Sequence, residues 1–246
     1  MNKNNFYLIV CLISINCFSQ NNEIGLFVGG TNYIGDVGPT RYIDPGRFEG
    51  SRTKSLTNNY AFGVLYKKHF NDRIAARIQI NFAKIGSNDN WKGSAVYRKQ
   101  RGKKFSNTIS NEIGLGVDFN FFKFDIKEDI FQMTPYIHTG IVFLSYNALH
   151  YPNGIDTAKK YDKKSTFAVP ITLGYKIKPL KSFIIAFEIS AKQTFSDNLD
   201  GSYPQFENMN LNSQKAFGSD LSKDWYIFSG FTFTYIFGSE PCYCPN

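Results

Sequence analysis

The sequence is poor in the residues that most often carry enzyme chemistry. It has three histidines and four cysteines among 246 residues. His69, His138 and His150 do not lie at a spacing from a serine or a pair of acids that would mark one of them as a catalytic group. The sequence also lacks a metal-ligand cluster, a phosphate-binding glycine loop and a nucleophile motif. We therefore expect a protein that is not an enzyme and that binds no cofactor or metal ion.

Hydrophobic runs are confined to the first residues. After residue 20, no apolar segment approaches the roughly 20 residues that a membrane-spanning helix needs. At the start, a single lysine precedes a short apolar run at residues 6–18, and small and polar residues follow. This order is typical of a secretory signal peptide. The sequence therefore predicts a signal peptide at residues 1–20 and an exported chain after it.

Only two cysteines remain once such a signal peptide is removed. Both lie in the closing segment, residues 238–246, which would be in an oxidising compartment. A disulfide between them would be strained, and two thiolates fall short of the four ligands of a zinc site. Two prolines stiffen the segment, so we favour a tail that presents a cysteine for an intermolecular disulfide. Two inconsequential thiols are the alternative. The candidate partner-binding residues are Pro241, Cys242, Tyr243 and Cys244.

Aromatic residues, by contrast, are abundant. They make up 17% of the chain, with 24 Phe and 15 Tyr. In an exported chain without spanning helices, this composition favours a β-structure, either a sandwich or a membrane barrel. Eight segments are predicted to be strands, and several of them alternate apolar and polar residues with the period of two that β-strands have, while the first is rich in glycine and the fifth is ambiguous. The eight segments span roughly residues 23–35, 58–70, 73–85, 105–124, 131–148, 165–178, 182–195 and 224–237.

The polar faces of these segments decide between the two β-structures. In residues 73–85, Ile74 and Ile78 share one face, and Arg73 and Arg77 share the other. A soluble sandwich would rarely place glycines and opposed charges on the wet face of strand after strand, whereas the interior of a small membrane barrel accommodates both. Eight strands leave an interior only wide enough for side chains, so we expect paired charges and no channel. The expected lumen network consists of Arg73, Arg77, Glu112, Asp118, Glu188 and Lys192.

Long and short connections alternate along the chain, as they do in outer-membrane barrels with short periplasmic turns and long extracellular loops. The sequence therefore predicts an all-β fold, an eight-stranded antiparallel transmembrane β-barrel in the cell outer membrane with both termini in the periplasm. The expected division is a signal peptide at 1–20, the barrel at 21–237 and a periplasmic tail at 238–246. The long connections are about 36–57, 86–104, 149–164 and 196–223, and the short ones are 71–72, about 125–130, and 179–181.

Part of the net charge of +8 lies in the second long connection. Basic residues there would face the phosphorylated glycolipid of the outer leaflet, lipopolysaccharide, and a merely solvated loop is the alternative. Nucleic acid is not expected as a partner, because it lies in another compartment. The candidate lipid-contacting residues are Lys92, Arg98, Lys99, Arg101, Lys103 and Lys104.

Several stretches of the sequence resemble a known family. The opening "EIGLFVGGTNYIGDVG", the internal "NEIGLGVDFNFF", "TPYIHTGIVF" and "AVPITLGYKIK", and the closing "PCYC" are similar to the PorG family of the Bacteroidota. Members of this family are small outer-membrane barrels that belong to the type IX secretion system. The resemblance covers residues 23–244, and its more specific parts are the glycine-rich opening and the "AVPITLGYK" stretch.

The resemblance implies a role without catalysis. In the PorG family the barrel is associated with a periplasmic ring of the lipoprotein PorK and its partner PorN, called GldK and GldN in gliding relatives, and it fixes the ring to the outer membrane. The resemblance thus implies these ring proteins as partners, and the lipoprotein as the partner of an intermolecular disulfide at Cys242 or Cys244. Two alternatives remain. One is a stand-alone surface barrel for adhesion or for stabilising outer-leaflet lipid, and the other is a lipid A-modifying enzyme, which only the three histidines favour.

Overall fold

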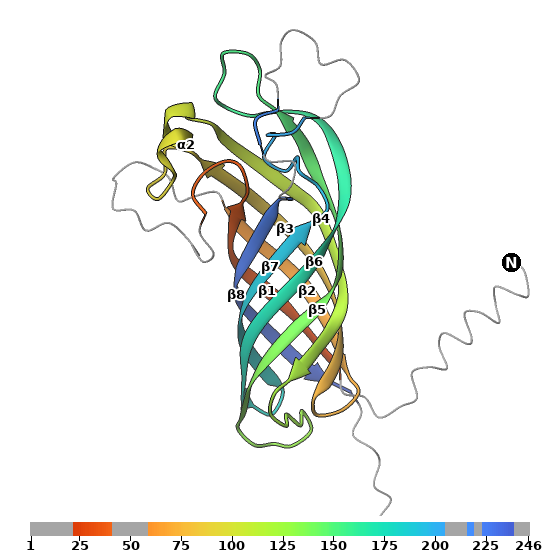
Figure 1. The fold of residues 1–246 in the computed structure, drawn as a ribbon. Coiled ribbons are helices and arrows are strands. Elements are labelled where there is room, and N and C mark those ends of the chain that lie inside the picture. Colours follow the sequence, from red (N-terminus) through yellow and green to blue (C-terminus); the bar gives the residue numbers. More distant parts are fainter. Residues whose placement is uncertain (1–21, 41–58, 205–215, 219–222, 239–246) are drawn as a thin grey trace, which may run out of the picture.

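Eight antiparallel strands close into a barrel. The computed structural model describes residues 22–40, 59–204, 216–218 and 223–238. Each strand pairs with the next one in the chain, and β1 pairs with β8, so the tilted arrows of Figure 1 form one cylinder. This confirms the predicted fold class. The strands are β1 (Asn22–Ile34), β2 (Tyr60–His69), β3 (Ile74–Asn88), β4 (Lys104–Asn120), β5 (Gln132–His150), β6 (Lys159–Leu180), β7 (Phe183–Thr194) and β8 (Trp225–Phe237).

The exterior of the cylinder is apolar and its interior is polar. On β4, Leu115 is 52% exposed, while Glu112 and Asp118 on the opposite face are each 1% exposed. Exposed aromatic and aliphatic side chains recur on the outward face of every strand. Exposing so continuous an apolar belt to water would be unfavourable, whereas lipid acyl chains cover it in a membrane. The alternation of residues therefore places the charged side chains inside, as the sequence predicted.

The two ends of the barrel differ in their connections. Short turns join β2 to β3, β4 to β5 and β6 to β7 at one end, which we name the turn end. The chain also enters β1 and leaves β8 at the turn end (Figure 1). The long connections emerge at the opposite end, which we name the loop end. The predicted alternation of connection lengths fails at the β5–β6 connection, residues 151–158, which is shorter than the β4–β5 connection, residues 121–131.

Side chains fill both openings of the cylinder. At the loop end, Tyr33, Phe105 and Leu149 belong to a buried hydrophobic cluster. At the turn end, Phe124 and Ile126 pack against Ile184. Most members of the loop-end cluster lie on the strands themselves, whereas Phe124 and Ile126 of the turn-end cluster come from the β4–β5 connection. Together with the polar lumen, the two clusters leave the barrel a solid body.

Two strands are longer than the sequence predicted. β3 runs to Asn88 and β6 begins at Lys159, although alternation indicated about residues 85 and 165. Pairing of β5 with β6 continues to His150↔Lys159, past a β-bulge between Ala148 and Leu149. Much of the third long connection is therefore a two-stranded ribbon. Its lysine-rich strand lacks an apolar face because it extends beyond the lipid, so the alternation that marks a strand stops while the strand continues.

The second long connection contains a short helix that strand periodicity does not predict. This helix, α2 (Val96–Arg101), ends at Gly102, whose φ of 71° is left-handed and whose N–H donates to the Arg98 carbonyl. A glycine in this conformation is a common helix terminator. No helix in the described ranges is long and apolar enough to cross a membrane.

Candidate functional site

A carboxylate on β4 organises the middle of the lumen. Lys67 Nζ on β2 lies 2.8 Å from Asp118 Oδ2, and Arg77 Nη1 on β3 lies 3.9 Å from Oδ1. His138 Nδ1 on β5 is 2.7 Å from the same Oδ1. All four side chains are buried because the alternation of their strands turns them inward. Opposite charges this close in a dry interior attract strongly, which offsets their lost hydration.

A second carboxylate, Glu188 on β7, extends this network across the barrel. It binds Arg77 Nη2 and accepts a hydrogen bond from the Tyr136 hydroxyl on β5. The ring of Tyr136 also lies 5.1 Å from Lys67 Nζ. Arg77 therefore links carboxylates of β4 and β7, which are not neighbouring strands, and the network joins several parts of the cylinder wall.

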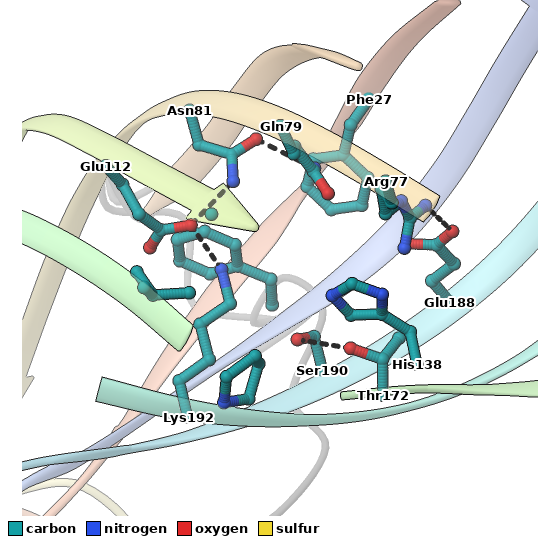
Figure 2. A pocket seen from close by; sticks show the side chains of 14 residues that line it. Phe27, Arg77, Gln79, Asn81, Glu112, His138, Thr172, Glu188, Ser190 and Lys192 are labelled. Atoms are coloured by element: carbon teal, nitrogen blue, oxygen red, sulfur yellow. Dashed lines mark hydrogen bonds and ion pairs between the residues drawn. The ribbon is translucent and has the colours of Figure 1, made fainter. Parts of the chain in front are cut away.

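Glu112 forms a separate group. Lys192 Nζ on β7 binds its Oε1, Asn81 Nδ2 on β3 donates to Oε1 over 2.6 Å, and the Tyr226 hydroxyl on β8 donates to Oε2 over 2.6 Å. Figure 2 shows Glu112, Asn81 and Lys192 of this group facing the Arg77–Glu188 pair across a cavity of about 20 Å³. A cavity of that volume holds about one water molecule. This level of the lumen therefore has no room for a solute.

Polar contacts also join the closing strands near the turn end. Glu23 on β1 binds His69 on β2, and it accepts a hydrogen bond of 3.0 Å from Thr234 Oγ1 on β8. All three residues are buried. Because β1 and β8 are the first and last strands, this group connects the two ends of the sheet at the seam where the barrel closes.

The connection between β4 and β5 closes the turn end from below. Lys176 Nζ on β6 lies 4.4 Å from the ring centroid of Phe124, and it has no hydrogen-bond partner among the described residues. Lys178 Nζ on the same strand donates to the carbonyls of Ile126, over 2.7 Å, and Glu128. The partners of these two lysines are thus an aromatic ring and two backbone carbonyls, not carboxylates. Through these contacts the lysines fix the β4–β5 turn across the opening of the barrel.

The structure places five of the six expected lumen residues in the lumen. They are Arg77, Glu112, Asp118, Glu188 and Lys192, and all are buried. The prediction for Arg73 was wrong. Arg73 is exposed at the turn end, where its Nη1 donates to the Phe121 carbonyl over 2.8 Å. It has the inward phase of the alternation, but β3 begins only at Ile74, so its side chain lies beyond the sheet and reaches solvent.

Four further charged residues of the lumen were missed in the sequence. On β2, exposed Phe62 and Val64 alternate with buried Ala61 and Leu65. Lys67 has the same parity as Ala61 and Leu65, so the alternation of this strand is the signal that could have placed Lys67 inside. The three lysines were not predicted because no acidic residue lies near them in the sequence. Their partners lie on other strands and turns and become neighbours only in the folded chain. The missed residues are Glu23, Lys67, Lys176 and Lys178, and all are buried.

Two of the expected lipid-contacting residues form ion pairs within the loop end. Arg101 Nε lies 2.8 Å from Asp89 Oδ2, and its Nη2 donates to the Asp36 carbonyl over 2.7 Å. Lys103 is only 4% exposed, and its Nζ lies 3.1 Å from Asp156 Oδ1. For buried Lys103 the expected lipid contact was wrong, because the folded connections supply a carboxylate that the sequence does not place beside it. The Arg101 side chain remains 20% exposed, so its contact with lipid stays a prediction.

The other four residues of that set remain on or near the surface. Arg98 is half-buried and its Nη1 donates to the Gly38 carbonyl over 2.6 Å, which leaves it partly engaged. Lys92, Lys99 and Lys104 are exposed. Their contact with lipid stays a prediction.

Buried carboxyl groups gather at the loop end. Asp224 accepts hydrogen bonds from the Tyr33 hydroxyl and from the Leu199 N–H, the latter over 2.9 Å, and Asp200 Oδ1 accepts one of 2.8 Å from the Ser202 N–H. Burial and then the charge of Asp200 raise the pKa of Asp224 well above its usual range, and burial raises the pKa of Asp200 as well. The two carboxyls therefore resist ionising together.

The histidines have ordinary structural partners. His69 binds Glu23 and His138 binds Asp118 inside the lumen, and the His150 ring lies 5.8 Å from the ring of Tyr161. No group of three His, Cys, Asp or Glu side chains is arranged to hold a metal ion in the part of the chain that the structure describes. The expected signal peptide and Pro241, Cys242, Tyr243 and Cys244 lie outside the described residues.

The closed sheet, its apolar belt and its charged interior define the class of protein. They are the features of an eight-stranded transmembrane β-barrel of the outer-membrane type. Within this class, the chain belongs to the family described as a domain of unknown function (DUF6089), whose model matches residues 2–246. No curated protein sequence matches the chain.

The chain is similar to several solved structures, including the following three. Ail of Yersinia pestis, in complex with the heparin analogue sucrose octasulfate, is 10% identical with a TM-score of 0.44, over 89% of this chain and 100% of that chain. Neisserial surface protein A is 7% identical with a TM-score of 0.44, over 88% and 97%. OprG of Pseudomonas aeruginosa is 8% identical with a TM-score of 0.45, over 90% and 97%. At such identities the likeness concerns the fold alone.

Proposed function

We propose that the protein is a non-enzymatic outer-membrane component of a type IX secretion system that anchors a periplasmic ring of the PorK/PorN, or GldK/GldN, type. The observation that carries the proposal is the filled lumen. Paired charges occupy the interior and hydrophobic clusters close both openings, so the two ends of a rigid body are available for contacts. The similarity of residues 23–244 to the PorG family supports the choice of partner.

The proposal orients the turn end toward the periplasm. In barrels of this class the short turns face the periplasm and the long loops face the exterior. With an even number of strands, the chain enters β1 and leaves β8 on the side of the turns. A tail after Phe237 would then enter the compartment of the ring, where thiols are oxidised.

The turn end offers a firm surface for such a contact. The Phe124 N–H and Asn120 Nδ2 each donate to the Asp72 carbonyl over 3.1 Å, which ties the β4–β5 turn to the β2–β3 turn. Beside them, Phe70 and Phe122 are 64% and 62% exposed. Aromatic side chains held on a rigid base are well suited to a protein interface.

Co-purification from solubilised membranes tests the proposal. Ring proteins should accompany the native barrel and a variant with shortened loops, and Phe122→Asp or deletion of residues 239–246 should reduce their recovery. An exposed substitution at the loop end, Lys99→Asp, serves as the matched control. The proposal would be rejected if shortening the loops released the ring proteins while the turn and tail variants retained them.

The proposed disulfide has its own test. On non-reducing gels of intact membranes, the native chain should give a shifted band that reductant removes. Cys242→Ser and Cys244→Ser would show which thiol takes part, and the double variant should lack the band. If alkylation before lysis modifies both thiols, neither forms a disulfide, and a covalent link is excluded. The co-purification experiment would then test non-covalent anchoring on its own.

A further inference from the structure

Among the strand residues that the structure describes, the outward Lys and Arg side chains toward the loop end lie on one side of the barrel, and outward Lys68 of β2 lies near the turn end. Lys84 on β3 stands between buried Ala83 and Ile85, so it points away from the lumen, and exposed Lys163 lies on β6. In contrast, β1 and β8 contain no Lys or Arg, and Lys192, the single basic residue of β7, is buried in the lumen. The side formed by β3 to β6 is therefore cationic.

The register of β5 and β6 shows where the cationic surface begins. Phe143 and Phe167 are paired on the outward face, with ring centroids 5.4 Å apart. Two residues further toward the loop end on each strand, the hydroxyls of Ser145 and Ser165 lie 2.9 Å apart. The next outward residue of β6 is Lys163. The face thus changes from aromatic through hydroxyl to ammonium over about 13 Å of strand.

The ribbon above this point adds further positive charge. Lys159 and Lys160 are exposed near the start of β6, and Lys104 is exposed at the start of β4. Lys104 and Thr157 form a β-bridge, which brings β4 to the tip of the ribbon. Asp162 is the one acid within the stretch "KKYDKK". The cationic surface is therefore a structural extension of the membrane-facing wall.

We propose that this surface, the loop-end side of β3 to β6, binds the phosphate groups of the outer-leaflet glycolipid. A ligand with acyl chains and phosphates matches a wall that is apolar up to Phe167 and cationic from Lys163 onward. Ammonium groups attract phosphate as point charges, and the attraction grows with their number near a membrane surface. The inference rests on the orientation in the proposed function and not on the ring.

The surface shares Lys104 with the set that the sequence indicated, but its other lysines differ. Arg101 and Lys103 of the second long connection are turned toward Asp89 and Asp156. The ribbon instead holds its lysines on a paired strand that continues from the lipid-covered wall. Backbone pairing fixes their height relative to the bilayer, which is what a headgroup site requires.

A binding titration of the purified full-length mature barrel in detergent tests the inference. The probe is diphosphoryl lipid A, and dephosphorylated lipid A is its matched control. The variant Lys159→Gln/Lys160→Gln/Lys163→Gln should weaken binding of diphosphoryl lipid A roughly tenfold or more, with the difference shrinking at high salt. Lys68→Gln/Lys123→Gln/Lys127→Gln, which removes the same charge at the turn end, should bind as the native barrel does. Resistance to unfolding on unheated gels checks that each variant is folded.

Three outcomes would overturn the inference. Unchanged binding by the ribbon variant would exclude these lysines, and equal binding of dephosphorylated lipid A would exclude the phosphates. Heparin or inorganic phosphate that binds as tightly as diphosphoryl lipid A would identify a general anion surface in place of a lipid site. Loss of ring co-purification with lipid A binding intact would reject the proposed anchoring alone, so the two proposals fail separately.

Discussion

Glu188 is a single side chain on which two buried groups depend. It is the carboxylate nearest Arg77 and the acceptor for the Tyr136 hydroxyl. Glu188→Leu would leave a buried guanidinium and a buried hydroxyl without this partner, so we expect the free energy of unfolding to fall by about 3 kcal/mol. Urea unfolding in lipid vesicles, followed by the shift between folded and unfolded bands on gels, measures the loss.

Arg73 and Arg77 provide the matched comparison for that experiment. Arg77→Met removes the buried cation and should also be strongly destabilising, while Arg73→Met at the exposed turn should change stability by no more than about 0.5 kcal/mol. Equal losses for both arginines would mean that the lumen network does not stabilise the barrel in the way its geometry indicates.

Asp200 and Asp224 give the loop end a dependence on pH. Their pKa values are raised in the folded barrel, so the folded state binds protons more tightly than the unfolded chain does. Stability from these groups is fully present below the usual pKa of aspartic acid and is lost as pH rises through their folded pKa values. The Leu199 and Ser202 amides, which donate to these carboxyls, should therefore be better protected from hydrogen exchange in mild acid than at alkaline pH.

Asp224→Asn tests the sign of this effect. The variant removes one of the two groups that resist ionising together, so protection of the Leu199 and Ser202 amides should vary less with pH once intrinsic exchange is corrected for. Protection that increases with pH in the native barrel would show that the carboxyls favour the ionised state, contrary to their burial.

Single residues also show what a sequence can specify. Alternation alone places Arg77 and Glu112 inside, because a side chain in a regular strand has only two faces to choose from. It fails for Arg73, because the phase of a strand does not say where the strand begins. It fails again for Lys103, whose partner Asp156 lies 53 positions away in a different connection. Connections have no period, so such pairs follow only from the folded chain.

The β4–β5 turn is the element that closes the turn end. Phe124 is fully buried beneath Lys176, whereas Phe122 in the same turn is exposed. Phe124→Ala should lower the free energy of unfolding by about 3 kcal/mol, because it leaves a cavity and removes the ring under a buried cation. Phe122→Ala should have little effect on stability. Urea titrations of both variants measure the difference.

The strands themselves were predictable where lipid imposes an apolar face. All eight were found, with ends displaced by a few residues in most cases. The ribbon at Lys159 was not found, since beyond the bilayer a strand is specified by backbone pairing and the sequence carries no trace of it. The short helix α2 was not predicted either, because six residues are too few to show a helical repeat of apolar residues.

The whole barrel is expected to be electrically closed. Around the cavity of about 20 Å³ the lumen is filled by Glu112, Lys192, Arg77 and Glu188, and such a cavity cannot pass hydrated ions. Planar bilayers containing the purified barrel should show no steady single-channel steps. Large, reproducible steps at neutral pH would mean that the paired charges separate and that the protein is a pore.

The uneven distribution of cations has a consequence for neighbouring molecules in the membrane. Within the strands β7, β8 and β1 the described residues include no outward Lys or Arg, and this side carries an apolar groove of about 320 Å³ lined by Ile24, Leu26, Phe183 and Phe233, among others. In the membrane plane the barrel therefore has two different sides, a front formed by β3 to β6 and a back formed by β7, β8 and β1. Two copies can contact each other through their backs without displacing charged headgroups. Contact through their fronts would require that the bound headgroups be displaced. Copies gathered above one ring would be restricted in rotation, each keeping its lipid-bearing side turned outward.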